Sequence, residues 1–154
     1  ELEKNLLLFY IGKTRNSSNI LQDQIKLIEE NNQETLNALH YVKELSDLPG
    51  IEFFPIADYG QPNYWLSVCL IDPSKAGIHK AEIIDLLEEN NIESRPVWKP
   101  MHLQPLYKDS QFFAIDEPCI SSTVFENGLC LPSGVSLAND QQNQVIALIR
   151  SLYK

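Results

Sequence analysis

The chain has 154 residues, of which 44% are hydrophobic and 21% are charged, and it carries a formal net charge of -9. This composition is typical of a single globular domain and excludes a disordered or low-complexity protein. The negative charge argues against partners such as nucleic acid or an anionic membrane surface, so we expect neither.

The N-terminal part of the chain predicts a strand followed by a long helix. Leu6–Ile11 is the longest apolar run, ended by Gly12; it suits a buried strand and is far shorter than the roughly 18 residues of a membrane span. Apolar side chains then recur at alternating spacings of four and three, which predicts a helix over about residues 18 to 46. Pro49 and Gly50 are a strong turn signal after this helix.

The middle of the chain alternates between strand and helix patterns. Ile51–Ile56 predicts a short strand, and Tyr64–Ile71 predicts a central strand because its two sides are both largely apolar. Ile78 to Asn90 has the pattern of an amphipathic helix. Ile92–Trp98 has strand character, and the three prolines between residues 96 and 105 argue against a regular element there.

The C-terminal part predicts two further helices around a short strand. Cys119–Glu126 predicts a helix that Gly128 ends, Gly128–Pro132 a short apolar strand, and Ser136 to Tyr153 a C-terminal helix. From residue 50 onward this order indicates an α+β fold, with a small antiparallel or mixed sheet and helices packed on one face.

The cysteines and histidines point to neither disulfides nor a metal site. Cys69, Cys119 and Cys130 form an odd set without a close pair, which fits a reducing compartment. The chain also opens without a signal-peptide pattern, so we expect a cytoplasmic protein. The three histidines are far apart and no Cys-x-x-Cys pair is present, so we expect no bound metal.

Local charge is the most informative feature of the sequence. No acidic residue lies between Glu93 and Asp109, and this window holds four basic side chains, Arg95, Lys99, His102 and Lys108. Arg and Lys near a rigid turn suit a phosphate or carboxylate, and an aromatic ring suits a flat ligand. A solvated proline-rich surface loop explains the same composition equally well, and the Trp, Met and His content also suits a protein–protein contact.

Signals for catalysis are few. His102 is a candidate general acid or base, but no partner for it is evident, so a structural or ligand-orienting role is the better interpretation. Ser133 is not in a nucleophile-elbow motif. The six glycines are never adjacent, so the chain has no glycine-rich phosphate loop.

Two segments resemble a known family. Residues 95–105 read Arg-Pro-Val-Trp-Lys-Pro-Met-His-Leu-Gln-Pro, and residues 124–134 read Val-Phe-Glu-Asn-Gly-Leu-Cys-Leu-Pro-Ser-Gly. Together, and over about residues 44 to 154, they resemble the C-terminal small domain of the pyridoxal-phosphate-dependent sugar-nucleotide aminotransferases, which have the fold-type I architecture. The resemblance implies a set of substrate-binding residues, namely Arg95, Trp98, Lys99, Met101 and His102.

The same resemblance implies that the cofactor-binding parts lie elsewhere. In the family, the Schiff-base lysine, the pyridinium-binding aspartate and the phosphate anchors belong to the large N-terminal domain, and no segment here matches them. Lys99 cannot take the lysine's role because it belongs to the substrate-side motif. We therefore expect no catalytic residue and no pyridoxal phosphate site in this chain.

Residues 1–45 resemble a different family. The run from Leu6 to Leu21 is similar to a strand–turn–helix of the heptose-phosphate kinase branch of the galactokinase, homoserine kinase and mevalonate kinase superfamily. The glycine- and serine-rich ATP loop of those kinases is missing, so the resemblance does not imply kinase activity. It divides the chain into a kinase-like segment, residues 1–45, and an aminotransferase small domain, residues 46–154.

Two hypotheses of function follow. The first is a truncated or fused aminotransferase small domain, related to sugar-nucleotide transamination in surface polysaccharide biosynthesis and inactive by itself. The second is a binding or interaction module that pairs with another chain, or that contacts a nucleotide-sugar through Arg95 and Lys99. The partner we expect is either a second copy of the chain or the family's large domain, and a nucleotide-sugar is a weaker candidate.

Overall fold

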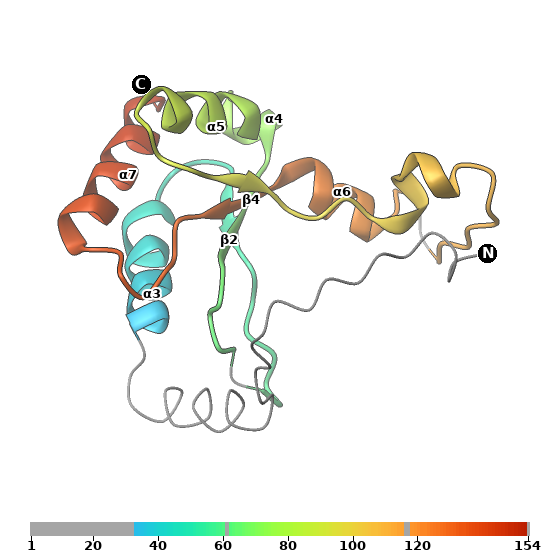
Figure 1. Cartoon of the computed structure of the whole chain (residues 1–154), viewed down its shortest axis with the longest axis horizontal. Helices are drawn as coiled ribbons and strands as arrows, with labels where there is room; N and C mark the ends of the chain where they lie inside the picture. Colours follow the sequence, from blue (N-terminus) through green and yellow to red (C-terminus); the bar gives the residue numbers. More distant parts are fainter. Residues whose placement is uncertain (1–32, 61, 116–117, 154) are drawn as a thin grey trace, which may run out of the picture. The chain divides into compact units, whose positions relative to one another are not determined.

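The computed structural model describes residues 33–60, 62–115 and 118–153, which belong to one compact unit. The predicted strand at Leu6–Ile11 and the first part of the predicted long helix, residues 18–32, lie outside the described residues. The rest of that helix is confirmed as α3 (Gln33–Leu45), which ends before the turn at Pro49 and Gly50 (Figure 1).

The sheet has four antiparallel strands in the order β1-β2-β4-β3. Their bounds are Ile51–Phe53 for β1, Ser67–Ile71 for β2, Arg95–Pro96 for β3 and Gly128–Leu131 for β4. Ile51 lies opposite Ile71, and Ser67 lies opposite Leu131. The prediction of an α+β fold with a small antiparallel sheet is therefore confirmed, and β2 is central as expected.

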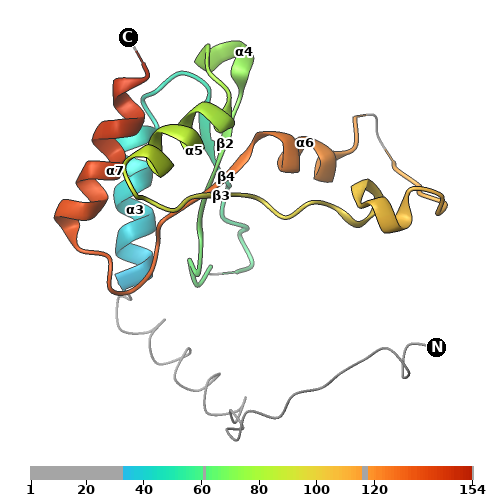
Figure 2. The same ribbon diagram turned by 45° about the horizontal axis from the view of Figure 1, so that its top comes forward.

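Three helices cover one face of this sheet: α3, α5 (Lys80–Glu89) and α7 (Asn139–Ser151), as Figures 1 and 2 show. Their apolar stripes meet alternate residues of the strands, as the period of two in a strand requires. The resulting core contains the following buried side chains: Tyr41, Leu45, Ile51, Cys69, Ile71, Ile83, Leu87, Leu129, Leu131, Val145, Ile146 and Ile149.

A fourth helix, α6 (Ile120–Asn127), runs directly into β4 and lies on the other side of the strands from α3 and α7 (Figures 1 and 2). It contacts β2 and β4. Gly128 ends it as predicted, although with a φ of -81° rather than in the left-handed region. The helices therefore do not all lie on one face, since α6 is an exception.

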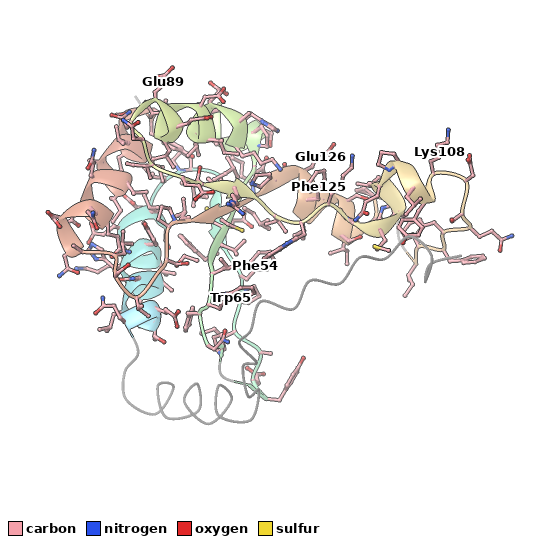
Figure 3. All side chains as sticks on the ribbon, in the orientation of Figure 1. Phe54, Trp65, Glu89, Lys108, Phe125 and Glu126 are labelled. Carbon is pink, nitrogen blue, oxygen red and sulfur yellow. The ribbon has the colours of Figure 1, made fainter. Side chains whose placement is uncertain are left out.

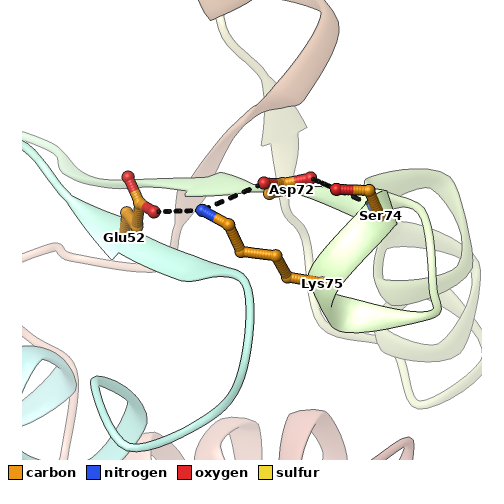
Figure 4. Close-up of polar contacts among 4 residues, drawn as sticks. All are labelled: Glu52, Asp72, Ser74 and Lys75. Carbon is orange, nitrogen blue, oxygen red and sulfur yellow. Dashed lines mark hydrogen bonds and ion pairs between the residues drawn. The ribbon is translucent and has the colours of Figure 1, made fainter.

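The short helix α4 (Pro73–Ala76) is fixed by its own cap. The Asp72 carboxylate accepts from the Ser74 amide at 3.0 Å and from its hydroxyl at 2.6 Å. Lys75 reaches from this turn to both Asp72, at 3.2 Å, and Glu52 of β1, at 3.1 Å (Figure 4). These ion pairs are exposed, so they contribute little to stability, but they join the turn after β2 to the edge strand β1.

Two predicted strands are shorter in the structure. The strand predicted from Tyr64 begins at Ser67, because Tyr64 has a φ of 48°, which no regular strand allows. The strand predicted over Ile92–Trp98 is reduced to β3, since Pro96 has no amide hydrogen and restricts pairing to an edge.

After β3, where the prolines lie, the chain forms two short 3₁₀ turns instead of an α-helix or a strand. Pro100 precedes η1 (Met101–Leu103), and Pro105 begins η2 (Pro105–Tyr107). This agrees with the prediction from proline spacing. In the described part of the chain, none of the helices combines the length and the hydropathy that a membrane crossing requires.

Candidate functional site

The predicted substrate-binding residues all lie on one stretch, residues 95–108, which we call the basic loop. It leaves the sheet at the edge strand β3, beside β4 (Figure 2), and continues through η1 and η2. Its start is fixed by the amide of Val97, which donates to the Gly128 carbonyl at 3.2 Å. The fold therefore anchors the basic loop at one end and presents the rest at the surface.

The cations of the basic loop are exposed. The Arg95 side chain is 75% exposed, and its Nε donates to the carboxylate of Glu93, two residues earlier, at 2.7 Å. Lys99 is exposed, and its ammonium lies 6.0 Å from the ring centroid of Phe125 on α6. Because Glu93, the partner of Arg95 among the described residues, is itself at the surface, the guanidinium can exchange it for a phosphate or carboxylate at little cost.

His102 differs from the other four predicted residues because its side chain is held by the protein. Its Nε2 lies 2.9 Å from the Ser122 hydroxyl of α6, and its ring stacks on Phe112 with centroids 3.8 Å apart. The arrangement has no carboxylate partner for the imidazole among these contacts. This geometry favours the orienting role over the acid–base role.

The two large apolar side chains of the set, Trp98 and Met101, are 66% and 57% exposed. The Trp98 ring lies 6.4 Å from that of Trp65, with the planes tilted by 30°. Met101 lies beside Gln104, whose amide also donates to the Lys99 carbonyl at 3.1 Å. An aromatic pair with free ring surface suits a flat ligand such as a nucleobase.

Trp65 also belongs to a large apolar cleft of about 1000 Å³ next to the edge strand β1. The cleft is lined by α3, by β1 with the segment that follows it, and by the segment that leads into β2; Phe54 and Trp65 both line it (Figure 3). Trp65 therefore connects this cleft to Trp98 of the basic loop. Apart from Glu52, the lining side chains are uncharged.

Among the described residues, the lining of the cleft includes no lysine for a Schiff base and no arginine for the phosphate of pyridoxal phosphate. Lys80 is the buried lysine of the described chain, but its ammonium donates to the Phe125 carbonyl and lies 4.9 Å over the Phe125 ring. Burial lowers its pKa, while Glu126 acts in the opposite direction. Lys80 is therefore held by contacts within the domain.

A metal site is also absent from the part of the chain that the structure describes. Its His, Cys, Asp and Glu side chains nowhere gather in a group of three or more that could hold an ion. Cys69 is fully buried, and burial raises the pKa of its thiol to about 12, so it is a core side chain.

Sequence reasoning missed the residues that support the basic loop. Trp65, Lys80, Ser122 and Phe125 contact it or its supports from three different elements. None of them carries a local signal, because each contact joins residues that are far apart in the sequence. The pairs Trp65–Trp98 and His102–Ser122 are properties of the fold rather than of a motif.

Comparison with known proteins assigns the family. The sequence profile of the DegT/DnrJ/EryC1/StrS aminotransferase family matches residues 14–150. The chain therefore belongs to this aminotransferase family. The match begins well inside residues 1–45, so the kinase resemblance of that segment is not supported: a strand, a polar turn and a helix recur in many α/β proteins and do not distinguish a kinase from an aminotransferase.

Two curated relatives show how similar the chain is to known proteins and how much of each it covers. The chain is 32% identical over 149 residues to EpsN of Bacillus subtilis strain 168, named as a pyridoxal phosphate-dependent aminotransferase; the match covers 93% of this chain and 38% of EpsN. It is 28% identical over 116 residues to the GDP-perosamine synthase of Vibrio cholerae, covering 73% and 30% of the two chains. The chain thus spans well under half of the length of these relatives.

Solved structures agree on the fold. DesV of S. venezuelae has a TM-score of 0.71 at 22% identity, over 88% of this chain and 35% of DesV. DesI, solved in the presence of its TDP-sugar product, has a TM-score of 0.65 at 25% identity, over 77% of this chain and 30% of DesI. The fold described above is therefore shared with about a third of each of these two chains.

Proposed function

We propose that this chain supplies the substrate-facing small domain of a sugar-nucleotide aminotransferase that acts in surface polysaccharide biosynthesis. The observation that carries the proposal is the basic loop. Its exposed side chains Arg95, Trp98 and Lys99 lie on one stretch, and Trp98 lies beside Trp65 of the apolar cleft. A relative named as a GDP-perosamine synthase and another named for spore coat polysaccharide biosynthesis, from Bacillus subtilis, support the substrate class.

The residues of the loop offer two kinds of contact to a ligand, which are charge-assisted hydrogen bonds and aromatic stacking. The Arg95 guanidinium is planar and can donate two parallel hydrogen bonds to a phosphate, and Lys99 adds a second cation nearby in sequence. Trp98 offers the flat face on which a nucleobase can stack. In a chain with a net charge of -9, this local excess of positive charge is what allows an anionic sugar nucleotide to approach.

A titration with uridine diphosphate, followed by NMR, tests whether the basic loop binds a nucleotide. We expect backbone amide shifts in residues 95–102 on addition of millimolar nucleotide, while the amides of α7 stay unchanged. The double variant Arg95→Gln, Lys99→Gln should weaken binding about thirtyfold or more, because each of the two lost charge-assisted bonds is worth roughly 1 kcal/mol or more. Lys108→Gln, at the exposed end of the same loop, is the matched control. Unshifted loop amides in the wild type would refute the assignment.

We also propose that the chain does not transaminate by itself. In support of this, the described lining of the cleft includes neither lysine nor arginine, and the buried Lys80 donates to the Phe125 carbonyl. Borohydride reduction after incubation with pyridoxal phosphate, followed by mass spectrometry, should find no single lysine modified stoichiometrically. One uniquely trapped lysine together with turnover of an amino donor would contradict this proposal.

The proposed partner of the domain is the polypeptide that carries the cofactor, either as the family's large domain or within a second chain. Apolar side chains are left at the surface at the end of the basic loop and just after it: Leu106 is 81% exposed, Phe113 is 86% exposed and Ile115 is fully exposed. Such side chains usually mark a contact with another polypeptide. Light scattering at high concentration tests self-association, and the cytoplasmic location stays a prediction.

A further inference from the structure

Two contacts join the basic loop to α6, and they have the same spacing on both sides. Lys99 and His102 are three residues apart in the loop, and Ser122 and Phe125 are three residues apart on α6. Since residues three apart lie on one face of a helix, Ser122 and Phe125 face the loop together. His102 Nε2 lies 2.9 Å from the Ser122 hydroxyl, and the Lys99 ammonium lies 6.0 Å from the Phe125 ring.

Phe125 of α6 is in turn contacted by Lys80 of α5. Lys80, at the first turn of α5, is only 9% exposed, donates to the Phe125 carbonyl and lies 4.9 Å over the Phe125 ring. Phe125, labelled in Figure 3, therefore lies near two ammonium groups, that of Lys80 on α5 and that of Lys99 in the loop. A buried ammonium over an aromatic ring is attracted more strongly than an exposed one, so Lys80 fixes the ring that Lys99 uses.

The loop needs such support because it has little regular structure of its own. After Val97 its backbone makes only the isolated turns of η1 and η2. A segment with so few internal bonds loses conformational entropy when it is ordered on a ligand, and that loss weakens binding. Contacts that order the segment beforehand remove the loss.

We propose that Ser122 and Phe125 of α6, supported by Lys80, are positioning residues that hold the basic loop in its ligand-ready conformation. They touch no ligand themselves and act through His102 and Lys99. The inference rests on the proposed function for the identity of the ligand, but the ordering of the loop is a property of the free protein and can be measured without any ligand.

The first experiment measures loop order directly. Steady-state ¹⁵N heteronuclear NOEs of the loop amides between residues 98 and 104 should fall in Ser122→Ala and in Phe125→Leu. They should stay unchanged in Ser121→Ala, whose hydroxyl contacts Cys119 rather than the loop, and in Phe125→Tyr, which keeps the ring. Urea unfolding should show the same midpoint for all four, so that the change is local. Unchanged NOEs in both Ser122→Ala and Phe125→Leu would overturn the proposal.

Lys99→Gln provides a second variant that leaves α6 intact. Since Lys99 is exposed, its substitution cannot unfold the domain, and it should lower the NOEs of the loop amides as Phe125→Leu does. If Phe125→Leu proves unfolded, this variant still tests the contact with the ring. Unchanged loop order in Lys99→Gln would overturn the part of the proposal that involves Phe125.

The second experiment connects order to binding. Titration with uridine diphosphate should give a Kd about three- to tenfold higher for Ser122→Ala than for Ser121→Ala, as expected for a residue that acts through another. A mobile loop with unchanged affinity would overturn the positioning role. If the wild type binds no nucleotide while its loop is ordered by α6, the proposed function fails and the ordering of the loop stands.

Discussion

The indole rings of Trp65 and Trp98 lie 6.4 Å apart, centroid to centroid, with a tilt of 30°. Trp65 precedes β2, and Trp98 follows β3, which is separated from β2 by β4. The pair therefore bridges across a strand and joins the apolar cleft to the basic loop. Because the chain has two tryptophans, its indole signals can be assigned to this contact.

A double-mutant cycle should detect this contact. Comparing Trp65→Leu, Trp98→Leu and the double variant by urea unfolding, we expect a coupling free energy of about 0.5–1.5 kcal/mol, the usual range for aromatic pairs. The matched control pairs Trp65→Leu with Tyr59→Leu, since Tyr59 is 95% exposed and should show no coupling. Additive effects of the two tryptophan variants would contradict the contact.

Gly128→Ala should destabilise the domain by about 1–3 kcal/mol, in the range of overpacked sites. A Cβ at this position would lie 2.4 Å from the Val124 carbonyl oxygen and 2.5 Å from Val97 Cγ2. The cause is purely steric, since the φ of Gly128 is -81°, which alanine adopts readily. Urea unfolding followed by circular dichroism measures the change.

Gly134→Ala is the control for this prediction, because nothing lies within 4 Å of a Cβ there. It should leave the free energy of unfolding within about 0.5 kcal/mol of the wild type. Equal effects of the two alanines would show that the crowding around Gly128, where the basic loop meets α6, relaxes without cost.

The fold was largely predictable because its elements follow local periodicity. Val145 and Ile149 are four residues apart in the predicted C-terminal helix, a spacing that predicts one buried face, and both are 1% exposed. The length of the second strand was not predictable, because the positive φ of Tyr64 is imposed by the surrounding loop rather than by its own residue type.

The candidate site was also predictable from the sequence only in part. The charge window located the basic loop, and the fold confirms that Arg95 and Lys99 are exposed. No local pattern predicts that His102 is held by Ser122 and Phe112, since both contacts depend on how the loop folds back. The substrate-binding role of the five predicted residues stays a prediction.

The three thiols should differ strongly in reactivity. Hydrogen bonds from the Ser121 side chain, and from Ser122, lower the pKa of Cys119, whereas burial raises the pKa of Cys69 to about 12 and also that of Cys130. Because the thiolate is the reactive form, Cys119 should react first with Ellman's reagent at neutral pH, and Cys69 only after unfolding.

The variant Cys119→Ser identifies the fast thiol. It should remove the fast phase completely and leave the thiols that appear in denaturant unchanged. Ser121→Ala should slow the fast phase, because it removes the largest cause of the lowered pKa. A fast phase that persists in Cys119→Ser would mean that the strand carrying Cys130 opens more readily than its burial indicates.

The ion pair between Asp47 and Arg150 should make stability depend on pH in the acid range. Both oxygens of the Asp47 carboxylate accept from the guanidinium at 2.7 Å, and Arg150 also donates to the Glu44 carbonyl, so the pair ties the end of α7 to the end of α3. The hydrogen bond from Arg150 holds the pKa of Asp47 below its ordinary value of 3.8. Asp47→Asn should therefore lower the urea midpoint at neutral pH.

The sign of the pH dependence follows from the lowered pKa. Below the ordinary value the unfolded chain binds a proton that the folded chain does not, so the contribution of the pair is complete above that value and is lost as pH falls through the folded pKa of Asp47. The midpoints of wild type and Asp47→Asn should therefore converge as pH falls below about 4. Lys43→Gln, which removes the exposed pair with Glu44 at 3.4 Å, should change the midpoint little at any pH. If the curves of wild type and Asp47→Asn stayed parallel down to the acid transition, the carboxylate would not be the group that holds the two helix ends together.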